Sequence, residues 1–436
     1  MEATKQSGVQ WIGEIPDSWK TKRIKYMANL KGRIGWQGLT SEEYQDEGAY
    51  LITGVDFLNG GIDWENCVHV PMSRWEEARE IQIQNGDLLI TKDGTIGKVA
   101  IVSDMPGETS LNSGVLRIMP IEGYSRRFLF WVLQSDEFWN WFNYKNAGNS
   151  TIQHLYQGDF AEFLYAFPDY EEQEAIADHL DIHCAELESI IADLEKQIET
   201  LKAYKKSLII ESVTKGVSPS QNYKHSGIDW IGEIPEHWQI KRLKYLCKFK
   251  TGGTPPDKFG INDEENGFPW ITAPDMSDSL LINNYSQYIS KEAIRSCGYK
   301  LFPPESILLV CIASVGKMGY ATIPCYANQQ ITAIMPYEFV CPKYLLYMIN
   351  SLDHKILADA ASNVVPIVNT GYLSNIVCLL PPKKEQEDIA KFLDDKLTTI
   401  DEIIDKKEKE YSTVVKHREA LIFEFVTGKR RVKEVL

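Results

Sequence analysis

The feature that most constrains the fold of this chain is an internal repeat. The stretch SGVQWIGEIPDSWKTKRIKYM at Ser7–Met27 recurs as SGIDWIGEIPEHWQIKRLKYL at Ser226–Leu246, an offset of 219 residues. Further along, EEQEAIADHLD at Glu171–Asp181 is matched by KEQEDIAKFLD at Lys384–Asp394, an offset of 213. A repeat of this length in a chain of 436 residues predicts two tandem copies of one structural unit.

Each copy begins with a globular part of mixed structure. Short apolar runs such as Asp87–Thr91 and Ser306–Val310 are separated by Asp-Gly, Gly-Gly, Pro-Pro and Asn-Gly pairs, which predicts several short strands and turns. The aromatic stretch Phe128–Phe142 has the spacing of an amphipathic helix, and we expect its rings to pack in the core.

Each copy ends in a segment that predicts a long helix. Large apolar residues recur every seven positions, with Lys407 as the interruption: Leu180, Leu187, Leu194, Leu201 and Leu208, then Leu393, Ile400, Val414 and Leu421. This is the spacing of a coiled-coil seam. No Pro or Gly interrupts Glu171–Thr214 or Lys384–Thr427, so each helix can run for about 43 residues, or roughly 65 Å. Two such helices would most simply pack antiparallel.

The predicted fold class is therefore α+β. We expect two pseudo-symmetric, globular, mixed α/β domains separated by two long helices that form an antiparallel coiled coil. The predicted segments are a first domain at 1–170, a central helix at 171–216, a second domain at 217–383 and a C-terminal helix at 384–436.

The formal net charge of −15 argues at first against a nucleic-acid partner. The acidity is concentrated, however, with −8 in residues 1–170 and −6 in 171–216. Basic residues cluster at equivalent places of both copies: Lys20, Lys22, Arg23, Lys25, Lys31 and Arg33, then Lys241, Arg242, Lys244, Lys248 and Lys250. These stretches are candidate phosphate contacts, and a solvated amphipathic strand is an equal alternative.

Base reading requires side chains with hydrogen-bonding groups on loops. The candidates follow short apolar runs or glycines: Thr53, Asp56, Lys92, Lys98 and Asn112 in the first copy, and Thr272, Asp275, Lys317, Asn328, Gln329 and Gln330 in the second. Each of the Thr, Asp, Asn and Gln residues could equally serve as a turn-forming residue.

Catalytic motifs do not fit. DGTIGKV at Asp93–Val99 lacks the first Gly and the final Ser or Thr of a phosphate loop, and a hairpin turn is favoured. Asp87, Lys92 and Asp93 could form a magnesium-dependent nuclease site, but the second copy has Ser306, Cys311 and Ile312 there. His179 and His183 lie four residues apart on the predicted helix without a following carboxylate, which favours solvated or packed histidines over a metal site.

The chain has no apolar stretch of bilayer length, since the longest, Ile307–Val315, is about half of what a span requires. The eight cysteines form no C-x-x-C pair, so neither a zinc ribbon nor a disulfide framework is expected. We expect a cytoplasmic protein with reduced thiols and no membrane partner.

The repeat, the paired WIGEIP openings, the GDLLITKDGTIGKVAIV run and the two EQE-x-I-A helices together resemble the specificity subunit of type I restriction–modification systems. The resemblance covers essentially the whole chain. It implies two target-recognition domains, at about 12–170 and 231–383, each reading one half of a bipartite double-stranded DNA target. It also implies that the two helices form the spacer that sets the gap between the half-sites.

The same resemblance implies a non-catalytic subunit that binds two methyltransferase subunits and restriction/translocase subunits. The chain itself is then expected to bind no cofactor, while S-adenosylmethionine, magnesium and ATP are held by the partners. Glycines at Gly252 and Gly253 resemble the family's opening loop, where backbone would approach phosphate, whereas the first copy departs from it with KGRIG at 31–35.

The leading hypothesis is thus a DNA-specificity subunit. The alternatives are a self-contained nuclease that uses Asp87, Lys92 and Asp93, and a coiled-coil protein scaffold without DNA binding.

Overall fold

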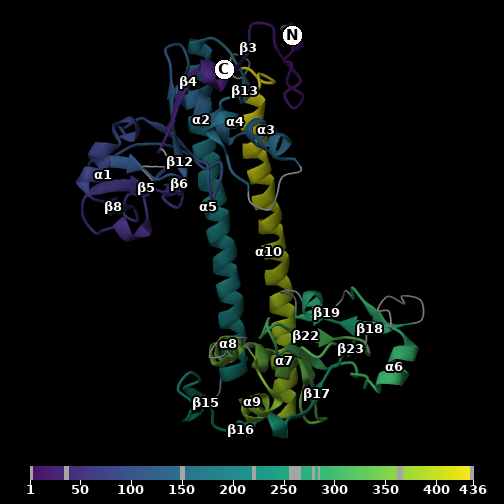
Figure 1. Ribbon diagram of the computed structural model, residues 1–436. Helices are drawn as coiled ribbons and strands as arrows, with labels where there is room; N and C mark the ends of the chain where they lie inside the picture. Colours follow the sequence, from purple (N-terminus) through teal and green to yellow (C-terminus); the bar gives the residue numbers. More distant parts are fainter. Residues whose placement is uncertain are drawn as a thin grey trace. The chain divides into compact units, whose positions relative to one another are not determined.

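The structure is a computed structural model that describes residues 3–33, 39–147, 153–218, 222–254, 267–276, 280–282, 285–360 and 367–432. It forms two compact units, the first made of Met1–Glu195 with Lys409–Leu436 and the second of Lys196–Glu408 (Figure 1). Each long helix is therefore divided between the two units. Ile34 and Gly35 of the first-copy loop lie outside the described residues.

The globular part of unit 1 is built on two small sheets. Its strands are β1 (Thr4–Gln6), β2 (Glu14–Pro16), β3 (Lys20–Arg23), β4 (Ala28–Gly32), β5 (Ala49–Ile52), β6 (Phe57–Leu58), β7 (Gly61–Ile62), β8 (Val68–Val70), β9 (Leu88–Thr91), β10 (Val99–Ile101), β11 (Thr109–Leu111), β12 (Val115–Pro120) and β13 (Leu164–Phe167). The first sheet is antiparallel in the order β10-β9-β12-β4, and the second, β11-β5-β8, contains the parallel pair β11 and β5. β9 pairs with β10 on one side and β12 on the other, and all four of its residues are buried.

Unit 2 repeats this arrangement. Its strands are β14 (Tyr223–His225), β15 (Glu233–Pro235), β16 (Gln239–Arg242), β17 (Cys247–Thr251), β18 (Phe268–Ile271), β19 (Leu281–Ile282), β20 (Tyr288–Ile289), β21 (Ile307–Val310), β22 (Met318–Ala321), β23 (Tyr326–Ala327), β24 (Ile331–Pro336) and β25 (Val377–Leu380). The larger sheet, β17-β24-β21-β22-β19, matches the first sheet of unit 1 with β19 added at its edge, and β20-β18-β23 matches the second. The predicted short strands at both apolar runs are confirmed.

Short helices cover the sheets. They are α1 (Met72–Glu77), α2 (Arg126–Gln134), α3 (Asp136–Asn146) and α4 (Gln157–Phe160) in unit 1, and α6 (Lys291–Cys297), α7 (Pro342–Asn350), α8 (Asp353–Ala360) and α9 (Thr370–Asn375) in unit 2. The single helix predicted over Phe128–Phe142 is wrong, because Ser135 separates α2 from α3 and its hydroxyl accepts a hydrogen bond from the Glu137 amide (3.2 Å). The predicted core role holds for most rings of the stretch, including Phe128, Trp141 and Phe142.

The two long helices are α5 (Tyr170–Lys215) and α10 (Lys383–Val426). In unit 1 the ring of His179 lies 4.4 Å from that of Phe425, and Glu188 binds Arg418 at 2.6 Å. In unit 2 Lys202 binds Glu408 at 2.9 Å and Lys205 binds Asp401 at 2.6 Å. Because partners on α10 come earlier as α5 proceeds, the helices pair antiparallel in each unit, as predicted. Of the seam residues, Leu180, Leu194, Leu393, Ile400 and Leu421 are buried, and Leu187, Leu201, Leu208 and Val414 are half-buried.

The EQE motif fastens the globular part of each unit to its long helix. In unit 1 the buried Gln173 accepts a hydrogen bond from the Ser125 amide (2.8 Å) and donates to the Pro168 carbonyl (3.0 Å). Its counterpart Gln386 does the same with Cys341 (2.8 Å) and Pro381 (2.9 Å). We call these two sets of contacts the glutamine anchors.

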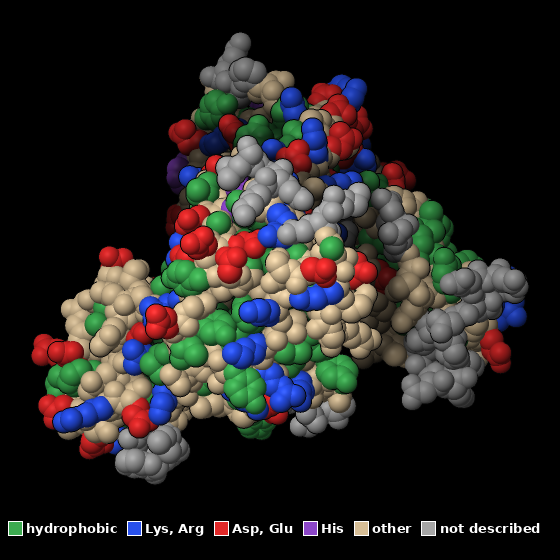
Figure 2. Space-filling view, turned by 90° about the horizontal axis from the view of Figure 1, so that it is seen from above, with side chains coloured by type: hydrophobic (Ala, Val, Ile, Leu, Met, Phe, Trp, Pro, Cys, Tyr) green, Lys and Arg blue, Asp and Glu red, His purple; other side chains and the backbone are tan. Residues whose placement is uncertain are grey.

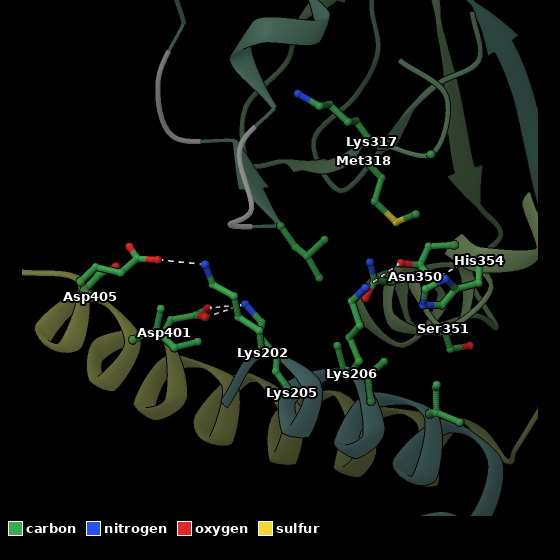
Figure 3. Close-up of a pocket in the computed structure, with 17 residues that line it drawn as sticks. Lys202, Lys205, Lys206, Lys317, Met318, Asn350, Ser351, His354, Asp401 and Asp405 are labelled. Atoms are coloured by element: carbon green, nitrogen blue, oxygen red, sulfur yellow. Dashed lines mark hydrogen bonds and ion pairs between the residues drawn. The ribbon is translucent and has the colours of Figure 1, made fainter. Parts of the chain in front are cut away.

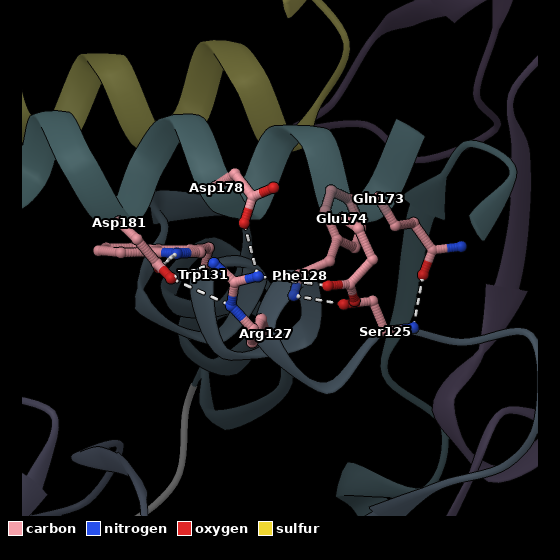
Figure 4. A network of polar contacts seen from close by, with 8 residues as sticks. All are labelled: Ser125, Arg127, Phe128, Trp131, Gln173, Glu174, Asp178 and Asp181. Carbon is pink, nitrogen blue, oxygen red and sulfur yellow. Dashed lines mark hydrogen bonds and ion pairs between the residues drawn. The ribbon is translucent and has the colours of Figure 1, made fainter. Parts of the chain in front are cut away.

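Ion pairs reinforce the anchor of unit 1, where side chains of α2 point toward a row of acids on α5 (Figure 4). Arg127 contacts Asp178 (2.7 Å) and Asp181, and the Trp131 indole N–H donates to Asp181 (2.7 Å). In unit 2 Lys343 and Tyr347 meet Asp394 in the same way, the tyrosine hydroxyl at 2.6 Å.

Candidate nucleic-acid interface

The basic stretches lie on β3 and β16, where the lysines and arginines are exposed. In the first copy Arg23 (2.9 Å) and Lys25 both bind Glu162, and Lys22 donates to the Tyr124 hydroxyl (3.1 Å). In the second copy Arg242 contacts Asn375 at 3.2 Å. Lys22 and Lys241 are exposed at matching positions of the two strands, and Gln239 occupies the position of Lys20.

Exposed tyrosines follow both strands. The Lys25 ammonium lies 5.1 Å from the ring centroid of Tyr26, and Lys244 lies at the same distance from Tyr245. Both copies therefore present a lysine over an exposed aromatic ring, a pairing suited to contact with phosphate and sugar.

Two basic residues of the first copy beyond β3, Lys31 and Arg33, are more enclosed. Arg33 is buried, and its guanidinium donates to the Leu111 carbonyl (2.7 Å) and the Ser110 hydroxyl (2.9 Å). Lys31 is paired with Glu80 at 2.9 Å. Arg33 thus has a structural role here, which its place in the predicted basic stretch does not reveal.

In the second copy Lys248 lies 5.9 Å from the ring centroid of Tyr337, and Lys250 donates to the Leu301 carbonyl (3.2 Å). Burial lowers the pKa of Lys250, and nearby Lys300 lowers it further. Lys248 is the more exposed of these two lysines.

Loops from separate parts of unit 1 meet at the ends of β5, β9 and β11. The Lys92 amide donates to the Gly114 carbonyl (2.8 Å), and the Leu155 amide donates to the Lys92 carbonyl (2.9 Å). The Asn112 amide donates to Ile52 (2.9 Å). These bonds join four segments, which we call loop cluster 1: residues 53–56, 92–98, 112–114 and 154–155.

Unit 2 builds the same cluster with the same backbone bonds. Cys311 donates to Gln330 (2.7 Å), Val368 donates to Cys311 (2.9 Å), and Asn328 donates to the Ile271 carbonyl (3.2 Å). We call residues 272–275, 311–317, 328–330 and 367–368 loop cluster 2. All of the predicted base-reading residues, Lys98 and Lys317 included, lie in these two clusters, one cluster per copy.

Several predicted readers also form turns. Asp56 accepts hydrogen bonds from the Thr53 amide (2.6 Å) and hydroxyl (2.9 Å), and Asp275 binds Thr272 in the same way at 2.8 and 2.7 Å. Burial raises the pKa of Asp56, against the effect of these bonds. Burial also acts on Asp275, but hydrogen bonds from Ser286 and Thr272 outweigh it and lower the pKa.

The amide side chains form turns as well. Asn112 accepts a hydrogen bond from the Gly114 amide (2.7 Å), and Asn328 accepts one from the Gln330 amide (3.1 Å). Gln329, which lies between Asn328 and Gln330, is exposed. The turn-forming alternative therefore applies to both asparagines and to both Thr–Asp pairs.

The glycines of the second copy allow close approach within the protein, Gly252 to backbone and Gly253 to an aromatic ring. A Cβ at Gly252 would lie 2.2 Å from the Ala327 carbonyl oxygen, and one at Gly253 would lie 2.5 Å from the Tyr299 ring. These contacts within the protein account for both glycines without a phosphate.

The charge of the surface is mixed. On the face drawn in Figure 2, Lys and Arg side chains lie among acidic and apolar ones instead of forming one continuous basic area.

A pocket of about 690 Å³ in unit 2 lies between the helices and the domain (Figure 3). Three of the lysines that line it are paired with acids: Lys202 with Glu408 (2.9 Å), Lys205 with Asp401 (2.6 Å) and Lys206 with Asp353 (3.8 Å). We interpret this pocket as part of the packing between the long helices and the globular domain, in which positive and negative side chains balance.

The nuclease alternative finds no support in the described parts of the chain. Asp87 is buried and binds Arg117 at 2.8 Å, while Asp93 binds His154 at 2.7 Å. Among the described residues, no three His, Cys, Asp or Glu side chains are grouped as a metal site would need. The described helices also include none with the length and apolarity of a membrane span.

The sequence model of the family described as "Type I restriction modification DNA specificity domain" matches residues 16–200 and 235–410. The chain belongs to this family. Its two matches fall one on each copy of the repeat, so both copies are DNA specificity domains, and DNA target recognition is the function that they share.

Relatives of the full length support this membership. A protein of Methanocaldococcus jannaschii, named as the specificity subunit of the type I restriction enzyme MjaX, is 28% identical and the match covers 97% of this chain and 96% of that protein. The EcoBI specificity subunit of Escherichia coli is 22% identical over 88% of this chain and 81% of its own. A solved structure described as concerning complex assembly and conformational transition of the type I R-M system has the same fold, with a TM-score of 0.70, 18% identity and coverage of 95% of this chain and 99% of that one.

Two features escaped the sequence-based predictions. The glutamine anchors were signalled by the repeated EQE motif, which the predictions used only as evidence of a helix. The pair of His154 and Asp93 in loop cluster 1 had no such signal, because the second copy has isoleucines at both positions.

Proposed function

We propose that each copy reads one half of a bipartite double-stranded DNA target within a type I restriction–modification complex. The observation that carries the proposal is that loop clusters 1 and 2 share their backbone hydrogen bonds and differ in their side chains. A common frame with different side chains suits two half-sites of different sequence. The repeat takes the place of the dimer that other readers use for spaced half-sites.

The long helices are proposed to set the gap between the half-sites and to dock two methyltransferase subunits. In support, the pair Glu188–Arg418 becomes Asp401–Lys205 when each residue is replaced by its equivalent in the other copy. Each unit thus presents an equivalent helix surface, which is what two identical partner subunits require. S-adenosylmethionine, magnesium and ATP are assigned to the methyltransferase and restriction partners.

The direct test exchanges one domain. We expect that replacing residues 1–170 with the first recognition domain of another subunit, in the complex with its methyltransferase subunits, changes one half of the methylated sequence and leaves the other half and the gap intact. Methylation mapping reads this outcome. A change in both halves would contradict the assignment of one domain to one half-site.

A second expectation concerns affinity. The net charge of −15 and the pairing of Arg23 and Lys25 with Glu162 predict weak DNA binding by the isolated chain and tighter binding once the methyltransferase subunits add their own phosphate contacts. Titration of labelled target DNA at fixed salt, with and without those subunits, measures the difference. Tight sequence-specific binding by the chain alone would contradict this part.

A further inference from the structure

Equivalent positions of the two loop clusters carry opposite chemistry. In cluster 1 the His154 ring nitrogen Nδ1 lies 2.7 Å from the Asp93 carboxylate oxygen Oδ1. In cluster 2 the residues at these positions are Ile312 and Ile367, which form an isolated antiparallel bridge. A polar pair in one copy thus stands where the other copy has an apolar pair.

The backbone establishes this equivalence independently of any side chain. The Lys92 amide donates to Gly114, and the Cys311 amide donates to Gln330. Residues 93 and 312 come directly after these two amides and are therefore equivalent. The Leu155 amide donates to Lys92, and the Val368 amide donates to Cys311. Residues 154 and 367 come directly before these two amides and are therefore equivalent. The two pairs therefore occupy one place in a shared frame.

Each pair offers an accessible side chain, while Ile312 is half-buried against the core of unit 2. The side chains of His154 and Asp93 are 40% and 43% exposed, and Ile367 is 47% exposed. They are flanked by the predicted readers Lys92 and Asn112 in cluster 1, and by Gln330 in cluster 2.

The chemistry of each pair suits a different base. The bond to Asp93 holds the imidazole by Nδ1 and leaves Nε2 as its second hydrogen-bonding atom, which can meet a polar base edge in the major groove. The isoleucine pair offers only methyl and methylene groups, which match the C5-methyl group of thymine. Contact with that methyl group would also remove exposed apolar surface from water.

We infer that Asp93–His154 and Ile312–Ile367 are equivalent base-reading positions, the first recognising a base edge by hydrogen bonding and the second a thymine methyl group by apolar contact. This inference rests on the proposed function, since it assigns specificity to residues within each half-site reader. Asp93 is a positioning residue, because it acts through the imidazole.

The test uses the full chain in complex with its methyltransferase subunits and target duplexes in which each base pair is varied in turn. For His154→Ala we expect about a tenfold loss of discrimination at one base pair of one half-site, with the other half-site unchanged. For Ile367→Ala we expect the loss at one A·T pair of the other half-site. Competition binding and methylation rates on the same duplexes measure both effects.

An exchange of the pair gives a sharper result. The double variant Asp93→Ile with His154→Ile copies cluster 2 into cluster 1, and we expect its preference at the affected base pair to move toward thymine. The matched control is His225→Ala, an exposed histidine in β14 outside both clusters, for which the preference at every base pair should be unchanged. Thermal unfolding of each complex checks that the variants are folded.

The outcomes separate the inference from the proposed function. If His154→Ala and the double variant keep the wild-type preference at every base pair, or weaken binding to all duplexes equally, the inference is overturned. If the wild-type complex itself shows no preference for a two-part sequence, the proposed function fails.

Discussion

Glu137 carries a carboxyl group into the apolar core of unit 1. Glu137 is fully buried at the start of α3. Burial raises the pKa of Glu137 well above its ordinary value, and neither of its carboxyl oxygens has a hydrogen-bond partner among the described residues. The folded protein therefore keeps this proton to higher pH than the unfolded chain does, and folding is coupled to pH.

The sign of this coupling gives the first prediction. Above the unfolded pKa near 4.5, the folded state holds a proton that the unfolded state has lost, so stability falls as pH rises, by up to about 1.4 kcal/mol per pH unit until the folded pKa is reached. Glu137→Gln should remove this contribution and raise the stability of unit 1 at neutral pH. Urea unfolding of both proteins at several pH values between 5 and 8 measures it.

The neighbouring Asp136→Asn is the control, because Asp136 is exposed on the same helix. We expect its unfolding free energy to follow the wild-type pH dependence. Equal pH dependence of the wild type and Glu137→Gln would contradict the buried-carboxyl account.

A second residue-scale difference lies in the hairpin turns of the two copies. Gly94 has φ +69°, and its counterpart Ala313 has nearly the same angle, +66°. Placing an L-residue in this left-handed region lowers the stability of the fold by roughly 1 kcal/mol. A Cβ at Gly94 would meet no atom within 4 Å, so the backbone conformation alone determines the effect of a substitution there.

Ala313→Gly should therefore stabilise unit 2 by about 1 kcal/mol, and Gly94→Ala should destabilise unit 1 by a similar amount. Paired denaturant titrations test both changes. Shifts of the same sign in the two variants would disagree with this account.

At the scale of elements, the glutamine anchors determine how each domain is held on its helix. Gln173 satisfies one backbone N–H and one backbone C=O at the junction of α2, β13 and α5. Because the site is buried, its loss leaves those groups without partners.

Gln173→Ala should destabilise unit 1 by about 2–3 kcal/mol, and Gln386→Ala should have the same effect on unit 2. Glu171→Ala, at an exposed position two residues earlier, is the control and should change stability by less than about 0.5 kcal/mol. Amide hydrogen exchange, followed separately in each unit, measures the local loss of stability. An effect of Gln173→Ala no larger than that of the control would show that the anchor contributes little.

The elements differed in how far the sequence predicted them. The long helices were predictable because a seven-residue period continues without Pro or Gly over many turns. The break at Ser135 was not, because apolar spacing continues through it and a serine inside a helix looks the same as a serine that caps the next one.

The candidate site shows the same limit. The turns at Thr53 and Thr272 repeat in sequence and were foreseen as alternatives. The pair of Asp93 and His154 joins residues 61 positions apart, and neither has a polar counterpart in the second copy, so only the folded loops bring it to notice.

At the scale of the whole molecule, the repeat explains why a chain with an excess of acids serves as a DNA reader. The frame is built twice with the same backbone hydrogen bonds, and under the proposed function a few exposed side chains in each loop cluster suffice to select the sequence. The proposed partner subunits would then supply the nonspecific phosphate contacts that an acidic chain lacks.

The central claim is that the two copies read two separate half-sites. The most direct measurement is selection of bound sequences from a random duplex library by the complex of this chain with its methyltransferase subunits. We predict two short motifs of different sequence separated by a gap of constant length and unspecified bases. One continuous motif, or two motifs with a variable gap, would contradict the claim.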